Sequence, residues 1–256
     1  MNTSLSNTLF IGQTLVKLKD VESTNNYLND LLSNVKPLVD GTVILAENQY
    51  SGKGQRGSSW ITEPGKNLTF SIFLNTVFLK ANQQFYLSMA VSLGVYDFIA
   101  NYSKDSVSIK WPNDIYINDK KIGGILIENI VSSNYLKNSI LGIGVNINQL
   151  IFSDDVNKAT SLSLENSCVY DLEILLNQLL SFIEARFLFL KSLQFEKLKV
   201  IYLSHLLGYN SLRKFEKYGV QFNGTITDVT SEGFLEITNS DGLAEKYDIK
   251  QISFIF

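Results

Sequence analysis

Two long segments of this chain repeat their apolar residues at helical spacing, and this feature most limits the folds open to it. In residues 83–101, Phe85, Met89, Leu93 and Tyr96 recur every three or four positions, which predicts one helix. Residues 171–207 are rich in Leu and Phe and predict a longer helical stretch. The other apolar segments are short, as strands are. The pattern therefore indicates an α+β fold.

Short segments with strand character fill most of the chain up to residue 150. We expect a third, shorter helix that is capped by Ser23 or Thr24 and places Leu28, Leu31, Leu32 and Val35 on one face. Two apolar segments flank the charged turn 118–121, which predicts a hairpin. These elements together predict a series of strands with helices between them. The expected strands are 10–19, 42–47, 67–74, 107–110, 115–117, 122–130 and 139–148.

The chain changes character near Gly208. Beyond it, short strand-like segments are separated by the turn dipeptides Asn223-Gly224, Glu232-Gly233 and Asp241-Gly242. We therefore predict two domains, a larger one over residues 1–208 and a small β-barrel over residues 209–256.

Composition excludes several classes of protein. A net charge of −3 argues against a nucleic-acid surface over the whole molecule. Cys168 is the one cysteine, so no intrachain disulfide forms, and one His with one Cys cannot make an ordinary zinc site. No signal peptide and no apolar run of membrane-spanning length is visible. A soluble cytoplasmic protein is the expectation.

A glycine-rich loop follows the second predicted strand. In Gly52-Lys53-Gly54-Gln55-Arg56-Gly57 the glycines let the backbone expose its N–H groups, and the two cations add positive charge. Phosphate or carboxylate is the natural guest, although a flexible surface turn with solvated charges has the same pattern. The loop is not a nucleotide P-loop, because Gly-Lys-Ser/Thr at the required spacing is missing.

Four further motifs combine polar residues with glycine or proline. Lys110-Trp111-Pro112-Asn113-Asp114 ends a strand, and its Asp could hold Mg²⁺ or orient a lysine. Lys121-Ile122-Gly123-Gly124 places a cation before two strand glycines, which suggests a close approach to the backbone. Ser23-Thr24-Asn25 begins a helix, and Asn146 needs partners within an apolar strand. Taken alone, each also suits a turn, a cap or a core position.

Together and in this order, the motifs resemble the biotin–protein ligase family, also called biotin–[acetyl-CoA-carboxylase] ligases. That family carries Ser-Thr-Asn on an early helix, a Gly-Arg-Gly-Arg/Gln-x-Gly loop followed by Trp, then Lys-Trp-Pro-Asn-Asp and a Lys-hydrophobic-x-Gly-Ile-Leu strand. Residues 23–25, 52–60, 110–114 and 121–126 match these motifs, and 142–148 and 159–162 also look like family segments. The resemblance covers nearly the whole chain, and it implies a catalytic domain with a central mixed sheet flanked by helices, followed by a small C-terminal SH3-like β-barrel.

The resemblance implies that biotin and ATP form biotinyl-5′-adenylate, which a lysine of a biotin carboxyl carrier domain then attacks. By the same resemblance, Mg²⁺ comes with ATP and lies near Asp114, and the catalytic residues are Lys53, Arg56 and Lys121. The implied biotin contacts are Ser23, Thr24, Asn25, Gln49, Gly52, Lys53, Gly54, Gln55, Lys121 and Gly124. The implied ATP or adenylate contacts are Lys53, Gly54, Gln55, Arg56, Trp60, Asn113, Lys121 and Asn146.

Two differences from the family matter. Lys53 stands where the family usually has Arg, and lysine keeps the charge but lacks the planar bidentate fork. The first motif begins at Ser23, so we expect no N-terminal helix-turn-helix domain and no specific DNA binding. The oligomeric state stays open between monomer and homodimer.

Two other functions compete with this one. A lipoate–protein ligase or octanoyltransferase of the same superfamily would share the fold, but Trp-Pro-Asn-Asp and the glycine-rich loop argue against it. A non-catalytic biotin-sensing protein is opposed by the presence of Lys121 and the complete loop.

Overall fold

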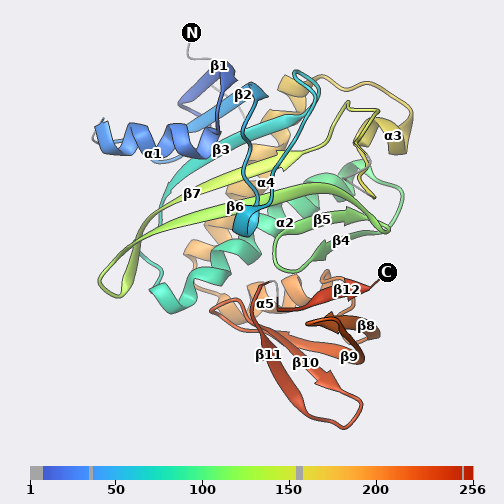
Figure 1. The fold of residues 1–256 in the computed structure, drawn as a ribbon. Helices are drawn as coiled ribbons and strands as arrows, with labels where there is room; N and C mark the ends of the chain where they lie inside the picture. The colour runs from blue at the N-terminus through green and yellow to red at the C-terminus, as the bar shows by residue number, and fades with distance from the viewer. Residues whose placement is uncertain (1–7, 35–36, 154–157, 250, 256) are drawn as a thin grey trace.

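A seven-stranded mixed sheet forms the centre of the molecule. The computed structural model describes residues 8–34, 37–153, 158–249 and 251–255 (Figure 1). The strand order is β1-β2-β3-β7-β6-β5-β4, in which β1 and β2 are parallel and every other neighbouring pair is antiparallel. The strands are β1 (Leu15–Val21), β2 (Val43–Gln49), β3 (Leu68–Asn75), β4 (Val107–Lys110), β5 (Asp114–Ile117), β6 (Lys120–Ser132) and β7 (Tyr135–Val145).

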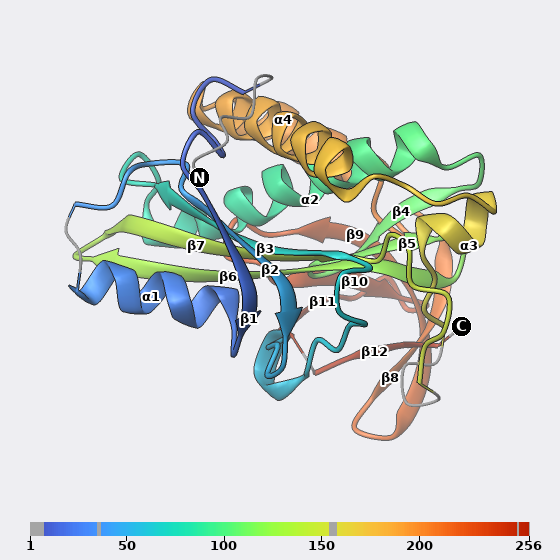
Figure 2. The same cartoon turned by 90° about the horizontal axis from the view of Figure 1, so that it is seen from above.

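One face of this sheet is covered by the two long helices α2 (Gln84–Tyr102) and α4 (Leu172–Lys191), which lie side by side in Figure 2. Alternate strand residues such as Phe70, Ile72 and Ile143 point into this layer and are almost fully buried. Gly94 of α2 permits the close helix crossing, because a Cβ there would lie 2.8 Å from the Cα of Ile183. The large hydrophobic core of the molecule therefore lies on this face.

The opposite face carries the single helix α1 (Thr24–Asn34), which connects the parallel strands β1 and β2 (Figure 2). A small cluster of Leu28, Ile44, Phe73 and Ile140 fixes it to the sheet. Val35, predicted to extend this helix face, lies outside the described residues. Because α1 covers only part of this face, the sheet beside its N-terminus is left for other groups.

Residues 171–207, predicted as one long helical stretch, do not form a continuous helix. It divides into α4 and α5 (Phe195–Ser204), and Leu193 between them has φ 58°. Leucine rarely adopts this left-handed conformation, so helical spacing alone did not reveal the break. A short helix that the spacing did not predict, α3 (Leu162–Asn166), is capped by Ser161, whose side chain accepts a hydrogen bond from the backbone N–H of Leu164.

The first predicted strand begins later than expected, because residues 8–11 have another partner. The buried carboxylate of Glu184 in α4 accepts hydrogen bonds from the backbone N–H groups of Leu9, Phe10 and Ile11 at 2.6, 2.9 and 2.8 Å. These donors are therefore satisfied by a side chain rather than by a sheet. The strand β1 starts only at Leu15.

A second, five-stranded antiparallel sheet follows α5, as the predicted fold class required. Its order is β11-β10-β9-β8-β12, formed by β8 (Leu212–Lys217), β9 (Val220–Val229), β10 (Leu235–Asn239), β11 (Ala244–Tyr247) and β12 (Ser253–Ile255). The Trp111 indole N–H donates to the carbonyl of Gly233, joining this sheet to the larger one. The domain boundary at residue 208 stays a prediction, because the buried core continues across it.

One of the three predicted turns in this region was wrong. Asn223-Gly224 lies inside β9, and the hairpin between β8 and β9 turns instead at Tyr218 and Gly219, which both have positive φ. Gly224 is needed for close packing, since a Cβ there would lie 2.4 Å from the Ile237 side chain. No helix in the described part of the chain is long and apolar enough to cross a membrane.

Candidate active site

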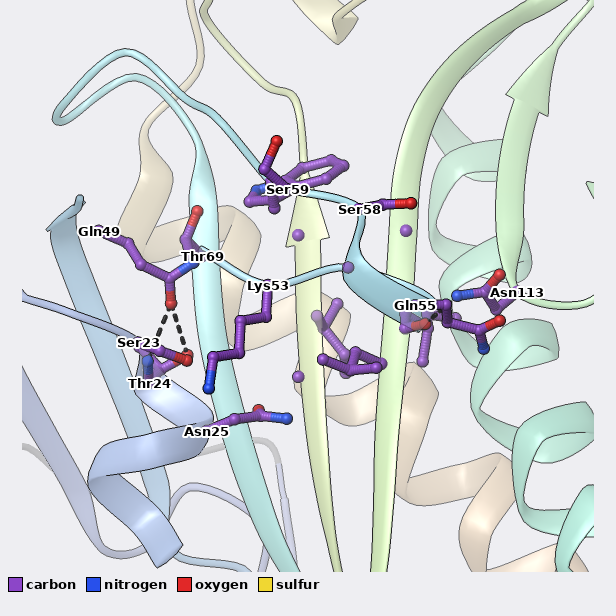
Figure 3. Close-up of a pocket in the computed structure, with 18 of the residues that line it drawn as sticks. Ser23, Thr24, Asn25, Gln49, Lys53, Gln55, Ser58, Ser59, Thr69 and Asn113 are labelled. Carbon is purple, nitrogen blue, oxygen red and sulfur yellow. Dashed lines mark hydrogen bonds between the residues drawn. The ribbon is translucent and has the colours of Figure 1, made fainter. Parts of the chain in front are cut away.

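A cavity of about 210 Å³ opens on the α1 face of the larger sheet. In Figure 3, Ser23, Thr24 and Gln49 lie at one side of it, Gln55 and Asn113 lie at the other, and Lys53 lies between them. Strand residues form its floor, and the loop after β2 forms its roof. The lining residues include Ser23, Thr24, Asn25, Gln49, Lys53, Gly54, Gln55, Ser58, Ser59, Trp60, Thr69, Asn113, Asp114, Lys121, Gly124, Leu126, Gly142 and Gly144.

Glycines make the floor of the cavity. Gly124 pairs with Gly144 across β6 and β7, and Gly142 lies two residues before Gly144, so all three face the same side. A Cβ on Gly142 would lie 2.5 Å from Asn25 Oδ1, and one on Gly144 would lie 2.3 Å from the Trp60 ring. Any larger residue would therefore fill the space between sheet and loop.

The glycine-rich loop folds back over this floor. The Trp60 N–H donates to the Gly52 carbonyl at 2.9 Å, and the Gly54 N–H donates to Ser58 at 2.7 Å. The Trp60 ring then lies over Gly144, close to Gly124. Trp60 Nε1 and Gln55 Oε1 are buried without a hydrogen-bond partner among the described residues. Buried polar atoms of this kind are what a polar ligand can satisfy.

Neutral polar groups gather at the α1 end of the cavity. The backbone N–H of Thr24 donates to Gln49 Oε1 at 2.9 Å. Ser71 Oγ lies 2.6 Å from both Thr24 Oγ1 and Asn25 Oδ1. The Asn25 amide also donates from Nδ2 to Glu128 Oε2 at 2.7 Å. A ligand bound here would meet a connected set of donors and acceptors.

The other end of the cavity holds an ion pair beside an aromatic ring. Lys121 Nζ pairs with Asp114 Oδ1 at 2.6 Å and lies 5.7 Å from the centroid of the Trp60 ring. Burial lowers the pKa of the neighbouring Lys110, and Asp114 partly offsets this effect. Lys53 reaches back from the loop and donates to Asn26 Oδ1 at 3.0 Å. The Lys53 ammonium therefore lies at the α1 end (Figure 3), while the charge of Lys121 at the other end is paired with that of Asp114.

The structure brings most of the predicted residues together, with three qualifications. Gly52 lies beside the cavity rather than in its lining, because its backbone is paired with Trp60. Asn146 is also outside the lining, and its amide donates to the Thr160 carbonyl at 3.0 Å. The Arg56 side chain lies outside what the structure describes. The ligand roles of all these residues stay predictions.

Asn113 and Asp114 have protein partners of their own. The Asn113 amide donates to the Ile125 carbonyl, and Asp114 holds Lys121. Within the described part of the chain, no cluster of three or more His, Cys, Asp or Glu residues could hold a metal ion. Asp114 is therefore not part of such a cluster among the described residues, and the assignment of Mg²⁺ to Asp114 stays a prediction.

Sequence reasoning missed Thr69, Ser71 and Glu128. Thr69 and Ser71 alternate along the α1 side of β3, and Ser71 pairs with Gly142 of β7. Two hydroxyl residues at positions i and i+2 of an otherwise apolar strand are the signal that could have found them. Glu128 carries no comparable signal, because its partner Asn25 is 103 residues away in the sequence.

Known proteins resemble this chain along most of its length. The model of the biotin/lipoate A/B protein ligase family matches residues 18–146. The bifunctional ligase/repressor BirA of Bacillus spizizenii is 29% identical over 241 residues, which cover 93% of this chain and 73% of that protein. The biotin–[acetyl-CoA-carboxylase] ligase of Mycobacterium tuberculosis is 30% identical over 151 residues, 58% of this chain and 54% of that protein.

A solved structure supports the same likeness. The biotin protein ligase from Aquifex aeolicus, in complex with biotin and ATP, superposes with a TM-score of 0.75 at 25% identity. The match covers 94% of this chain and 97% of that one, so it includes both sheets.

Proposed function

This chain belongs to the biotin/lipoate A/B protein ligase family, and from that premise we propose that it is an ATP-dependent biotin–protein ligase. The observation that carries the proposal is one cavity with two chemically different ends. Neutral hydrogen-bonding groups surround Thr24, and the ammonium of Lys121 lies at the other end. Biotin likewise has a neutral polar ring at one end and a carboxylate at the other.

The chemistry requires positive charge at the carboxylate end. A carboxylate oxygen of biotin attacks the α-phosphorus of ATP, forming a carboxylate–phosphate anhydride and releasing pyrophosphate. This step brings two anions together, which cations in a shielded site stabilise. We assign this role to Lys121, held by Asp114, and to Lys53, whose ammonium contacts Asn26 Oδ1 in this structure and would move to the reacting groups with the loop.

The second step transfers the acyl group. The neutral amine of an acceptor lysine attacks the carbonyl carbon of the anhydride, AMP leaves, and the amine loses a proton to form the amide. No residue of the enzyme needs to become acylated. The loop and Trp60 over the floor glycines would exclude water from the anhydride, which hydrolysis would otherwise destroy.

The acceptor that we propose is the lysine of a biotin carboxyl carrier domain, in keeping with the names of the relatives. Mg²⁺ would arrive with the phosphates of ATP, and no step above depends on a protein ligand to it. A cytoplasmic location remains part of the proposal.

Labelling of a carrier domain tests the function. The protein is incubated with biotin, ATP, Mg²⁺ and the carrier domain, and a streptavidin blot is expected to show biotin on the carrier. Lys121→Ala should lower the rate about 100-fold, because a cation at the reacting groups is lost. Lys120→Ala is the matched control, since Lys120 is exposed and pairs loosely with Glu165 at 3.7 Å.

Two results would contradict the proposal. Equal labelling by Lys121→Ala and the wild-type protein would remove the assignment of Lys121. Release of pyrophosphate with lipoate but not with biotin would identify the protein as a lipoate ligase of the same family.

A further inference from the structure

We infer that Glu128 is a positioning residue that sets the direction of the hydrogen bonds that the cavity offers to the ureido ring of biotin. Glu128 is not in the cavity lining and would act through Asn25, Ser71 and Thr24. The inference rests on the proposed function, because it explains how this site would recognise a ring that contains both N–H and C=O groups.

The direction begins at the carboxylate. Glu128 Oε2 lies 2.7 Å from Asn25 Nδ2, and an ionised carboxylate can only accept hydrogen bonds. The Asn25 amide must therefore turn its NH₂ group toward Glu128. Its oxygen is then directed at Ser71, 2.6 Å away. Asn25 is almost fully buried and presses against Gly142, so its amide is held in this orientation.

The orientation of Asn25 determines where the Ser71 hydroxyl donates its proton. Ser71 is fully buried and makes two contacts of 2.6 Å, to Asn25 Oδ1 and to Thr24 Oγ1. A hydroxyl has one proton, and an amide oxygen cannot donate, so the Ser71 proton goes to Asn25. In the second contact Ser71 is again the donor, so the same proton is shared with Thr24 Oγ1 unless Asn25 holds it. The Thr24 hydroxyl donates its own proton to Gln49 Oε1 at 3.2 Å. Thr24 Oγ1 is then left with lone pairs and acts as an acceptor.

Gln49 lies beside Thr24 and offers a hydrogen-bond donor rather than an acceptor. Its Oε1 accepts hydrogen bonds from the backbone N–H of Thr24 at 2.9 Å and from the Thr24 hydroxyl at 3.2 Å. With the oxygen held in this way, the NH₂ group is the part of the Gln49 amide left to donate to a ligand. The cavity thus offers an acceptor next to a donor. The ureido group of biotin, with N–H beside C=O, complements this pair. The dithiolane ring of lipoate, the competing substrate, has neither group.

The variant Glu128→Gln tests the inference, because a Gln amide has nearly the same size but can donate as well as accept. Asn25 could then turn its NH₂ group toward Ser71, and the Ser71 proton would go to Thr24 Oγ1, where it would compete with the ligand for the lone pairs of that oxygen. We expect the Kd of biotin, measured by calorimetry, to rise about tenfold. Desthiobiotin, which keeps the ureido ring but lacks the sulfur, should lose affinity by the same factor, and the KM for ATP should stay the same.

A double-mutant cycle separates positioning from general damage. Ser71→Ala removes the hydroxyl that links Asn25 to Thr24. Adding Glu128→Gln to this variant should therefore change the Kd of biotin less than twofold. Ser71→Ala alone should show the same loss specific to biotin, which keeps the test available if Glu128→Gln does not fold. Glu173→Gln, an exposed carboxylate paired with Lys17, is the surface control.

The possible results distinguish a failure of the role of Glu128 from a failure of the proposed function. An unchanged Kd in Glu128→Gln, effects that multiply in the double variant, or an equal rise in the KM for ATP would each overturn the role of Glu128. If the wild-type protein itself does not bind biotin, the proposed function fails first. If the wild type binds biotin and all variants bind equally well, only this inference fails.

Discussion

The two faces of the seven-stranded sheet share the same strands but differ in composition around the cavity. Toward α2 and α4, the strands present large apolar side chains such as Phe70, Ile72 and Ile143. Toward α1, at the same strand positions shifted by one residue, they present Ser71, Gly142 and Gly144. Because strand side chains alternate, one sequence builds a packed core and a ligand cavity back to back.

The comparison shows how stability and function are separated in this protein. The packed face buries its area against helices and supplies most of the hydrophobic stabilisation. Around the cavity, the α1 face has glycines in place of larger side chains, which leaves space, and its polar groups form hydrogen bonds with one another. Substitutions on the two faces should therefore affect different measurements.

The largest effect is expected from Phe98→Ala on the packed face. Phe98 is fully buried in α2, with its ring 5.2 Å from that of Tyr102 and 6.4 Å from that of Phe182. Its removal leaves a cavity and should lower the free energy of unfolding by about 3–5 kcal/mol. Urea denaturation measures this loss. A change in the KM for biotin in the protein that remains folded would break the separation between the faces.

Two glycines allow the same substitution on opposite faces. Gly94→Ala places a methyl 2.8 Å from the Ile183 backbone, so the helices must separate, at a cost of about 1–3 kcal/mol of stability. Gly144→Ala places it in the Trp60 ring, a loop side chain that can move, so stability should change by less than about 1 kcal/mol.

Activity should show the reverse order for this glycine pair. Gly144→Ala should lower kcat/KM for biotin about tenfold, whereas Gly94→Ala should leave it unchanged. Thermal melting and the rate of carrier labelling, measured on the same preparations, provide the comparison. Similar losses of activity in both variants would show that the two faces are coupled.

Glu184 is a polar exception on the packed face. Its buried carboxylate accepts three backbone N–H groups, from Leu9 to Ile11. Glu184→Gln keeps the shape but replaces one oxygen with a donor, so we expect a loss of about 1–2 kcal/mol in the free energy of unfolding. The measurement is a urea titration beside the wild-type protein, with biotin binding as the control. Unchanged stability would show that these hydrogen bonds contribute no net free energy.

His205 should give the smallest effect. Burial lowers its pKa below the ordinary 6.5, and its ring stacks on Tyr96 at 4.1 Å. The unfolded chain therefore takes up this proton first as pH falls, so stability is full above about pH 6.5 and declines below it. His205→Phe keeps a ring but does not titrate, and should show a smaller loss of stability between pH 7 and 5.5. Identical slopes for the two proteins would contradict this assignment.

The motifs along the chain located the cavity well, because each is a local pattern of glycine and polar residues. Ser23 to Asn25, the glycine-rich loop and Lys121 are far apart in sequence yet line one space. The elements also followed from periodicity. The partners of these residues followed only in part. A lysine partner for Asp114 was one of two expectations, and Asp114 pairs with Lys121. The pairing of Asn25 with Glu128 depends on how α1 packs on the sheet, which a single sequence does not specify.

Errors in the predicted fold arose where tertiary packing overrides a local signal. Asn-Gly is a strong hairpin signal, but Gly224 serves the approach of Ile237 instead of a turn. Leu193 ends a helical run in a conformation that leucine rarely adopts. Residues 10–14 have strand character, yet the segment before β1 is fixed by Glu184 rather than by a neighbouring strand.

The contact between Glu184 and the first described residues has a consequence for the order of synthesis. Ile11 emerges from the ribosome 173 residues before its partner. At translation rates of roughly 5–20 residues per second, these N–H groups wait on the order of ten seconds or longer for Glu184. The edge of the sheet that is made first is therefore secured only after α4 has been made, and until then β1 is held by its parallel neighbour β2 and by the cluster under α1, against which Val16 and Leu18 pack.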